Sequence, residues 1–181
     1  MNLRLAAAKV YTPRRLRIRR LRELYELTAE AFDRPVPDIR RCRVSGLLDS
    51  YARFTLDAAS AWVCAGKPAT VAERLREAGF KFGAGLGREL GVRSRSEVME
   101  AARLLYRFIG IDFQGGADGR VVIGRCFFAG FYSPEACLLM SALDDGVVSG
   151  LAWGGSLVFT GRITQGGPVC EAKFVFPENT P

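Results

Sequence analysis

Hydrophobic residues in the first half of the chain recur at helical spacing. The first such segment predicts an amphipathic helix from Arg14 to about Phe32, and the prolines of DRPVPD end it because proline cannot continue a helix. The same spacing predicts helices over about 38–65, over 70–90, and from a serine cap at Ser94 or Ser96 to Gly110. The first of these helices presents its apolar side through Leu16, Leu21, Leu24, Leu27 and Ala31.

The second half of the chain changes to alternating apolar and polar positions. The turn signals QGG and ADG predict a hairpin with strands near 110–113 and 120–128. A helix follows in YSPEACLLMSALDDGVVSGL, with Ser133 as its cap and Pro134 in its first turn. The segment SLVFTGRITQGGPVCEAKFVF predicts a second hairpin that turns at 165–168.

This order of elements predicts an α+β fold in a single domain, 1–181. A helical layer, about 12–110, packs on a small antiparallel sheet made of two hairpins joined by a helix, about 110–177. The glycine-rich run FGAGLG lies inside a predicted helix. It lacks the lysine and the preceding strand of a phosphate-binding loop, so we interpret its glycines as a place where another backbone approaches closely.

Composition narrows the class of protein. The chain has 181 residues, of which 49% are hydrophobic, and no apolar run reaches the length of a membrane span. We read no secretory signal at the N-terminus and predict a cytoplasmic, bacterial protein. In that reducing compartment five cysteines, an odd number, indicate free thiols rather than a disulfide framework.

Positive charge is concentrated in one predicted helix. The net charge is +7, and six arginines lie between Thr12 and Glu23. Such a face can bind nucleic acid, anionic lipid or an acidic partner, or it can be a solvated helix surface. No aromatic residue interleaves the run and no nucleic-acid-binding motif accompanies it, so we interpret it as solvated and dispensable for folding. The apolar faces of the helical half predict a homodimer.

The chain contains no histidine, which excludes Ser-His-Asp and Cys-His catalysis and imidazole-ligated zinc within it. A general base would have to be Asp, Glu, Cys, Tyr or Lys.

Three cysteines in the second half are candidates for a site. In the predicted helix, Cys137 and Asp144 lie on one stripe with Ser141, beside an apolar stripe that contains Met140. Two further cysteines lie late in one strand and early in another, so we expect three thiols and a carboxylate to converge: Cys126, Cys137, Cys170 and Asp144.

Three interpretations of these thiols stay open. They are small apolar core residues, ligands of a metal, or reactive or substrate-contacting thiols beside a carboxylate. The spacing lacks CxxC pairs, so a thiolate-bound metal is not favoured, and no cofactor is expected. The two cysteines of the first half, Cys42 and Cys64, are interpreted as core residues.

The last 60 or so residues resemble the L-2-amino-thiazoline-4-carboxylic acid hydrolase family. Ser141 stands where that family often has a second cysteine, and Gly167 replaces an acidic residue. The layout is also similar to that of 4-vinyl-reductase (4VR) type small-molecule-binding domains and of ligand-binding domains linked with nitric-oxide signalling and vesicle tethering. The positions that carry the resemblance are Cys126, Cys137, Asp144, Gly150, Leu151, Gly166, Cys170 and Phe174.

The resemblance implies a hydrolase that opens a C–N bond in a small sulfur-containing cyclic amidine such as 2-amino-thiazoline-4-carboxylate. Asp144 or Asp145 would activate water or accept a proton, and Cys137 or Cys126 would be nucleophile or substrate contact. Arg125 or Arg162 would hold the substrate carboxylate. The substrate-binding set would be completed by Ser141, Cys170 and Trp153.

Two alternatives remain beside the hydrolase. The first is a non-catalytic module that binds a hydrophobic or tetrapyrrole-like ligand, and the second is a dimeric adaptor without a ligand. In the binding module an aromatic lining would be formed by Phe127, Phe128, Phe131, Tyr132 and Trp153.

Overall fold

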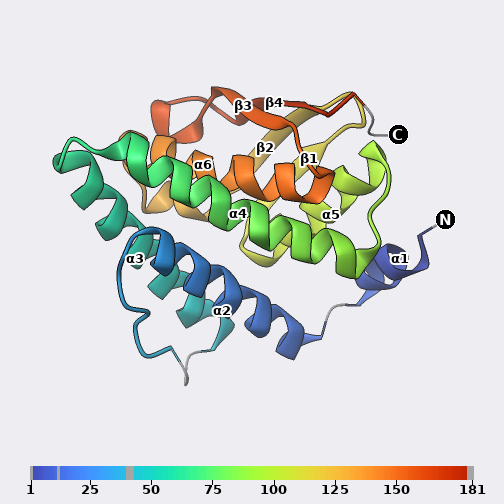
Figure 1. Ribbon diagram of the computed structural model, residues 1–181, viewed down its shortest axis with the longest axis horizontal. Helices are drawn as coiled ribbons and strands as arrows, with labels where there is room; N and C mark the ends of the chain where they lie inside the picture. The colour runs from blue at the N-terminus through green and yellow to red at the C-terminus, as the bar shows by residue number, and fades with distance from the viewer. Residues whose placement is uncertain (1, 12, 40–42, 179–181) are drawn as a thin grey trace.

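Helices cover one face of a four-stranded antiparallel sheet, which confirms the predicted α+β fold (Figure 1). The computed structural model describes residues 2–11, 13–39 and 43–178. The helices are α1 (Leu3–Val10), α2 (Arg14–Ala31), α3 (Val44–Cys64), α4 (Pro68–Leu90), α5 (Arg95–Phe108) and α6 (Pro134–Ala152). The strands are β1 (Ile111–Gly115), β2 (Arg120–Cys126), β3 (Ser156–Gly161) and β4 (Cys170–Val175), and short 3₁₀ turns η1 (Phe127–Gly130) and η2 (Ile163–Gln165) follow β2 and β3.

The element bounds differ from the sequence-based prediction in three places. Helix α1 was not predicted: Asn2 caps it by accepting a hydrogen bond from the Leu5 amide, and the buried Leu5 holds it on α5. The helix predicted from about residue 38 begins at Val44, because Asp38 and Ile39 lie in a non-helical segment from which Ile39 enters the core. The predicted strand 120–128 ends at Cys126, since the following residues form η1.

The sheet has the strand order β1-β2-β4-β3, so each predicted hairpin is present and the two are joined side by side through β2 and β4. One face is apolar and lies against the helices, as in other antiparallel sheets with one solvated face. In β4 the alternation is complete: Cys170, Ala172 and Phe174 are buried, whereas Glu171 and Lys173 are exposed. Helix α6 packs against β3 on one side and α4 on the other (Figure 1).

Glycines let α4 and α6 cross at very short distance, which confirms the close-packing interpretation of the FGAGLG run. A Cβ atom at Gly83 would overlap the carbonyl of Val147, and one at Gly79 would overlap the carbonyl of Leu143. On the opposite helix, Gly150 lies in the same way against the Phe80 carbonyl. Only glycine permits this approach of two backbones.

The arginine-rich helix α2 is not a uniformly solvated surface, which corrects the sequence-based interpretation. Arg15 and Arg19 are exposed, but Arg20 is buried and pairs with Glu23 and with Glu89 of α4. A buried charge needs such partners, because burial without them is costly. Arg20 therefore contributes to the attachment of α2 to α4, a role that the charge pattern alone did not reveal.

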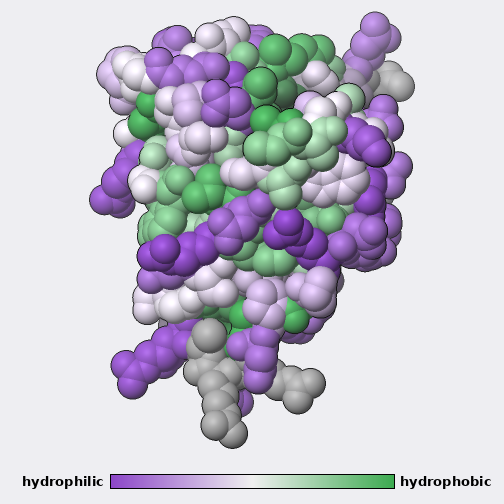
Figure 2. Space-filling model, turned by 90° about the vertical axis from the view of Figure 1, so that its left-hand side faces the viewer, coloured by the Kyte–Doolittle hydropathy of each residue, from purple (hydrophilic) through white to green (hydrophobic). Residues whose placement is uncertain are grey.

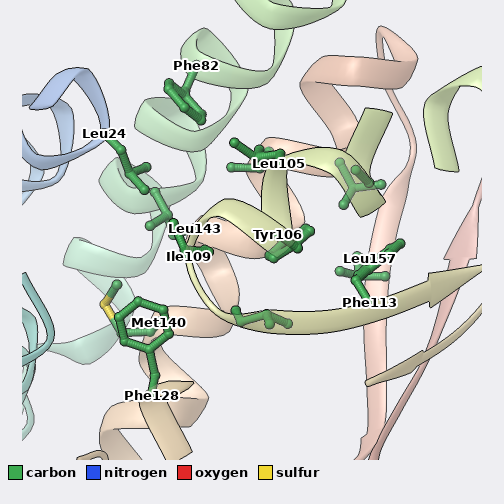
Figure 3. Packing of buried hydrophobic residues seen from close by; sticks show 14 of the residues in the cluster. Leu24, Phe82, Leu105, Tyr106, Ile109, Phe113, Phe128, Met140, Leu143 and Leu157 are labelled. Atoms are coloured by element: carbon green, nitrogen blue, oxygen red, sulfur yellow. The ribbon is translucent and has the colours of Figure 1, made fainter. Parts of the chain in front are cut away.

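The core lies between these layers and is built from every part of the chain. Figure 3 shows how Leu24 of α2, Phe82 of α4, Leu105 of α5 and Leu143 of α6 approach one another, with Met140 close to Phe128. On the end face drawn in Figure 2, hydrophilic and hydrophobic side chains are intermixed. Among the described residues, no helix combines the length and the apolar character needed to cross a membrane.

Candidate functional site

A cavity of about 70 Å³ lies within the core, between α6 and the inner face of the sheet. Most of its wall is apolar, with contributions from α2, α4, α5 and η1. Several side chains drawn in Figure 3 belong to this wall, among them Leu24, Phe82, Phe128 and Met140. This volume accommodates roughly five water molecules.

The thiols and the carboxylate that the sequence analysis expected to converge all line this cavity. Cys137 and Asp144 face it from α6, two helical turns apart. Cys170 faces it from the first position of β4, and Cys126 faces it from the last position of β2. The predicted convergence is therefore confirmed.

A β-bulge brings Cys126 to the cavity. The register of β1 and β2 shifts at this point, since Phe113 pairs with Ile123 but Asp112 pairs with Arg125, so Gly124 is the extra residue. Ile123 is buried on the inner face, and simple alternation would have sent Cys126 to the outer face. The extra residue instead turns Cys126 inward and leaves Arg125 exposed.

Asp144 provides an acidic group in this apolar surrounding. The hydroxyl of Tyr106 donates a hydrogen bond to Asp144 Oδ1 over 2.8 Å. Burial raises the pKa of Asp144 to about 6, against the opposing effects of the Tyr106 hydrogen bond and the positive charge of Arg162. Asp144 therefore changes its charge close to neutral pH, which is a common property of acid–base groups in enzymes.

The thiols are held in the protonated form. Burial raises the pKa of Cys126 to about 12, and it also raises the pKa values of Cys137 and Cys170. The amide of Ile163 donates to the sulfur of Cys170 over 3.4 Å, and this opposes but does not cancel the effect of burial. A nucleophilic cysteine needs a lowered pKa, so the raised pKa values of these thiols favour neutral thiols that contact a ligand over thiolate attack.

We expect slow alkylation of these thiols in the folded protein. At pH 7.5 iodoacetamide should label Cys64, which is exposed, much faster than Cys126, Cys137 and Cys170. In denaturant, where burial is lost, the four should react at similar rates. Peptide mass spectrometry with timed quenching measures this, and rapid labelling of Cys137 in the folded state would contradict the assignment of neutral thiols.

The neighbouring carboxylate, Asp145, which was predicted as an alternative catalytic group, lies outside the cavity wall and binds other parts of the protein. Asp145 Oδ2 accepts from Arg76 Nε over 2.5 Å, and Oδ1 accepts from the Leu157 amide over 2.7 Å. Ser149 also donates to it over 3.3 Å. Adjacent helical residues point about 100° apart, so Asp145 leaves the cavity face and ties α6 to the start of β3.

Arg162 and Ser141 lie beside the cavity rather than in its wall. Nε and Nη2 of Arg162 are each 3.3 Å from Ser141 Oγ, and the guanidinium stacks on Phe159. Ser141 Oγ also donates to the carbonyl of Cys137 over 2.8 Å. The charge of Arg162 lowers the pKa of Asp144, so this arginine is close enough to influence the site.

Two of the predicted substrate contacts, Arg125 and Trp153, lie outside the cavity wall. Arg125 lines a separate groove, and Trp153 is exposed at the end of α6, where Arg88 stacks on its ring. Of the predicted aromatic lining, Phe128 and Tyr132 do face the cavity. Phe127 and Phe131 are outside its wall and pack against each other.

Three tyrosines line the cavity, and the sequence analysis missed two of them, Tyr51 and Tyr106, while it predicted Tyr132 only as an aromatic lining residue. Tyr106 binds Asp144, Tyr51 binds Thr28 over 3.0 Å, and Tyr132 binds Thr55 over 2.6 Å. Each ring comes from a different element, so periodicity gave no signal for them. The hydroxyls add a set of paired polar groups to the cavity.

Cys64 is exposed at the end of α3, so its interpretation as a core residue is wrong, and Cys42 lies outside the described residues.

Within the part of the chain that the structure describes, no group of three or more Cys, Asp or Glu side chains is arranged to hold a metal ion.

Comparisons with protein-family models, with curated proteins and with solved structures find no match for this chain.

Proposed function

We propose that this protein binds a small cyclic amidine in the cavity and opens its ring by hydrolysis. The observation that carries the proposal is the partly buried Asp144 carboxyl, whose pKa is raised to about 6 and which faces the same small space as three neutral thiols. The resemblance of the C-terminal segment to the 2-amino-thiazoline-4-carboxylate hydrolases supports the same class of substrate.

Recognition would rest on charge pairing in an apolar space. An amidinium group carries parallel N–H donors that match the two oxygens of a carboxylate, and such charge-assisted bonds are strongest away from water. Asp144 would bind this group while Tyr106 holds its Oδ1. The ring would lie against the sulfur atoms and Met140, and Arg162 would approach a substrate carboxylate from beside Ser141.

The reaction would use Asp144 as general base. A water molecule attacks the amidine carbon and transfers a proton to the carboxylate, and the tetrahedral intermediate then breaks its ring C–N bond as that proton passes to the departing nitrogen. The product equals substrate plus one water. A carboxylate with a raised pKa accepts the proton more readily than an ordinary aspartate and is still ionised above pH 7.

The test is incubation with 2-amino-thiazoline-4-carboxylate at pH 7.5, followed by mass spectrometry for a product one water heavier. We expect Asp144→Asn to reduce turnover at least about 100-fold, as for loss of a general base. Asp112→Asn is the matched control, because Asp112 is exposed on β1. Equal turnover in Asp144→Asn and wild type would refute the assigned base.

A second candidate function is non-catalytic binding of a compact apolar ligand, and the mostly apolar wall with its neutral thiols favours it. A tetrapyrrole is much larger than a 70 Å³ cavity, so the ligand would be a small molecule. Calorimetric binding of an uncharged compound of similar size, without turnover of the amidine, would support this candidate over the hydrolase. Absence of both binding and turnover would reject the amidine for either role.

The predicted homodimer and cytoplasmic location remain predictions. The exposed side chains of Leu3, Val10 and Tyr11 are consistent with a contact between copies through the helical half.

A further inference from the structure

A second hollow lies between α1, α5 and the β1–β2 hairpin. It is a groove of about 360 Å³, and it is separated from the cavity by Ile111, which lines both. Its charged wall consists of Lys9, Glu100, Arg103, Arg107, Asp112 and Arg125. The wall thus combines four basic with two acidic side chains, which leaves a surplus of two positive charges.

Three arginines from α5 and β2 line this groove. Arg103 and Arg107 are four residues apart on α5, so their side chains lie on one face of that helix. Arg125 reaches the groove because the bulge at Gly124 directs it away from the inner face of the sheet. Helix α5 packs against β1, which brings the two sources together.

Within the described part of the chain, no ion pair neutralises the three arginines of the groove. Lys9 forms an ion pair with Glu100 at 3.1 Å, so these two charges neutralise each other. Asp112 is the cross-strand partner of Arg125, yet the two form no ion pair. Across residues 2–11, 13–39 and 43–178, Arg103, Arg107 and Arg125 have no ion pair or hydrogen bond from their side chains.

We propose that this groove is a binding site for a phosphate dianion, either free or as a small phosphate monoester. Planar guanidinium groups donate paired hydrogen bonds to phosphate oxygens, and the surplus of two positive charges matches a dianion. An extended nucleic acid fits less well, because Asp112 and Glu100 would repel its further phosphates and the groove's aromatic side chain, Phe113, is buried. The proposal is independent of the hydrolase.

The experiment is isothermal titration of the whole protein at pH 7.5 and low salt, with inorganic phosphate and with phenyl phosphate as probes. We expect Arg103→Gln combined with Arg107→Gln to weaken binding at least about 10-fold, and Arg125→Gln to weaken it several-fold. The control pair, Arg14→Gln with Arg15→Gln, removes the same charge from an exposed part of α2 and should change the dissociation constant less than about two-fold.

The outcomes separate specific from general electrostatic binding. Tighter binding of phenyl phosphate would identify a monoester as the ligand class, whereas equal binding would identify the phosphate group alone. Equal weakening by the control pair would show a general charge effect and overturn the proposal, as would lack of binding by wild type at about 10 mM of either probe. Circular dichroism of each variant checks its fold, since exposed substitutions usually cost under about 0.5 kcal/mol.

Discussion

Gly83→Ala should destabilise the protein strongly, although it adds a single methyl group. The new Cβ would overlap the Val147 carbonyl, which belongs to the backbone of α6 and cannot rotate away. Relief requires α4 and α6 to move apart along a contact that also involves Gly79, Gly146 and Gly150. Overpacking of this kind costs about 1–3 kcal/mol, and loss of neighbouring contacts adds to it, so we expect about 3 kcal/mol less stability in urea unfolding.

The same helix offers a matched control, Gly85→Ala. Gly85 lies two residues along α4, and a Cβ there would meet no atom within 4 Å. Alanine is the better helix former, so this variant should be more stable than wild type by about 0.5–1 kcal/mol. Two variants with identical chemistry would thus shift stability in opposite directions. If both variants lost the same stability, the loss at Gly83 would not come from the close approach of α4 and α6, and the prediction would be wrong.

Asp144→Asn should change how stability depends on pH. The folded pKa of Asp144, about 6, lies above the usual aspartate pKa of 3.8, so the folded state binds the proton more tightly than the unfolded state does. The stability contributed by this group is therefore complete below about pH 4 and is lost as pH rises through 6. The pKa difference of about two units corresponds to about 3 kcal/mol.

Asparagine has no charge to bury, so the loss of folding stability with rising pH should disappear in Asp144→Asn. The free energy of unfolding of Asp144→Asn relative to wild type should rise by about 2–3 kcal/mol between pH 4 and pH 8. Asp112→Asn, on the exposed face of β1, should show no such rise. Parallel curves for Asp144→Asn and wild type would mean that Asp144 is not buried as an ionisable group. A variant that is stabilised at pH 8 yet inactive would indicate that this carboxylate is retained for function.

Much of the architecture followed from local patterns. Helical spacing in the first half and alternation in the second predicted the α+β class, and the glycines of FGAGLG predicted a close backbone approach. Helix geometry placed Cys137 and Asp144 on one stripe, because residues seven apart lie on the same face. The helix α1 and the late start of α3 escaped prediction, since Leu5 and Ile39 are held by distant parts of the core.

Only the tertiary structure determined the direction and the pairing of individual side chains. The bulge at Gly124 sent Cys126 inward and Arg125 to another groove, against simple alternation in β2. Tyr106 binds Asp144 across 38 positions of sequence, a pairing that no local period contains. The spacing of apolar residues along a helix or strand indicates which of its faces is buried. The partner that meets this face, the charge it carries and the space left between them depend on packing of elements that are distant in the chain.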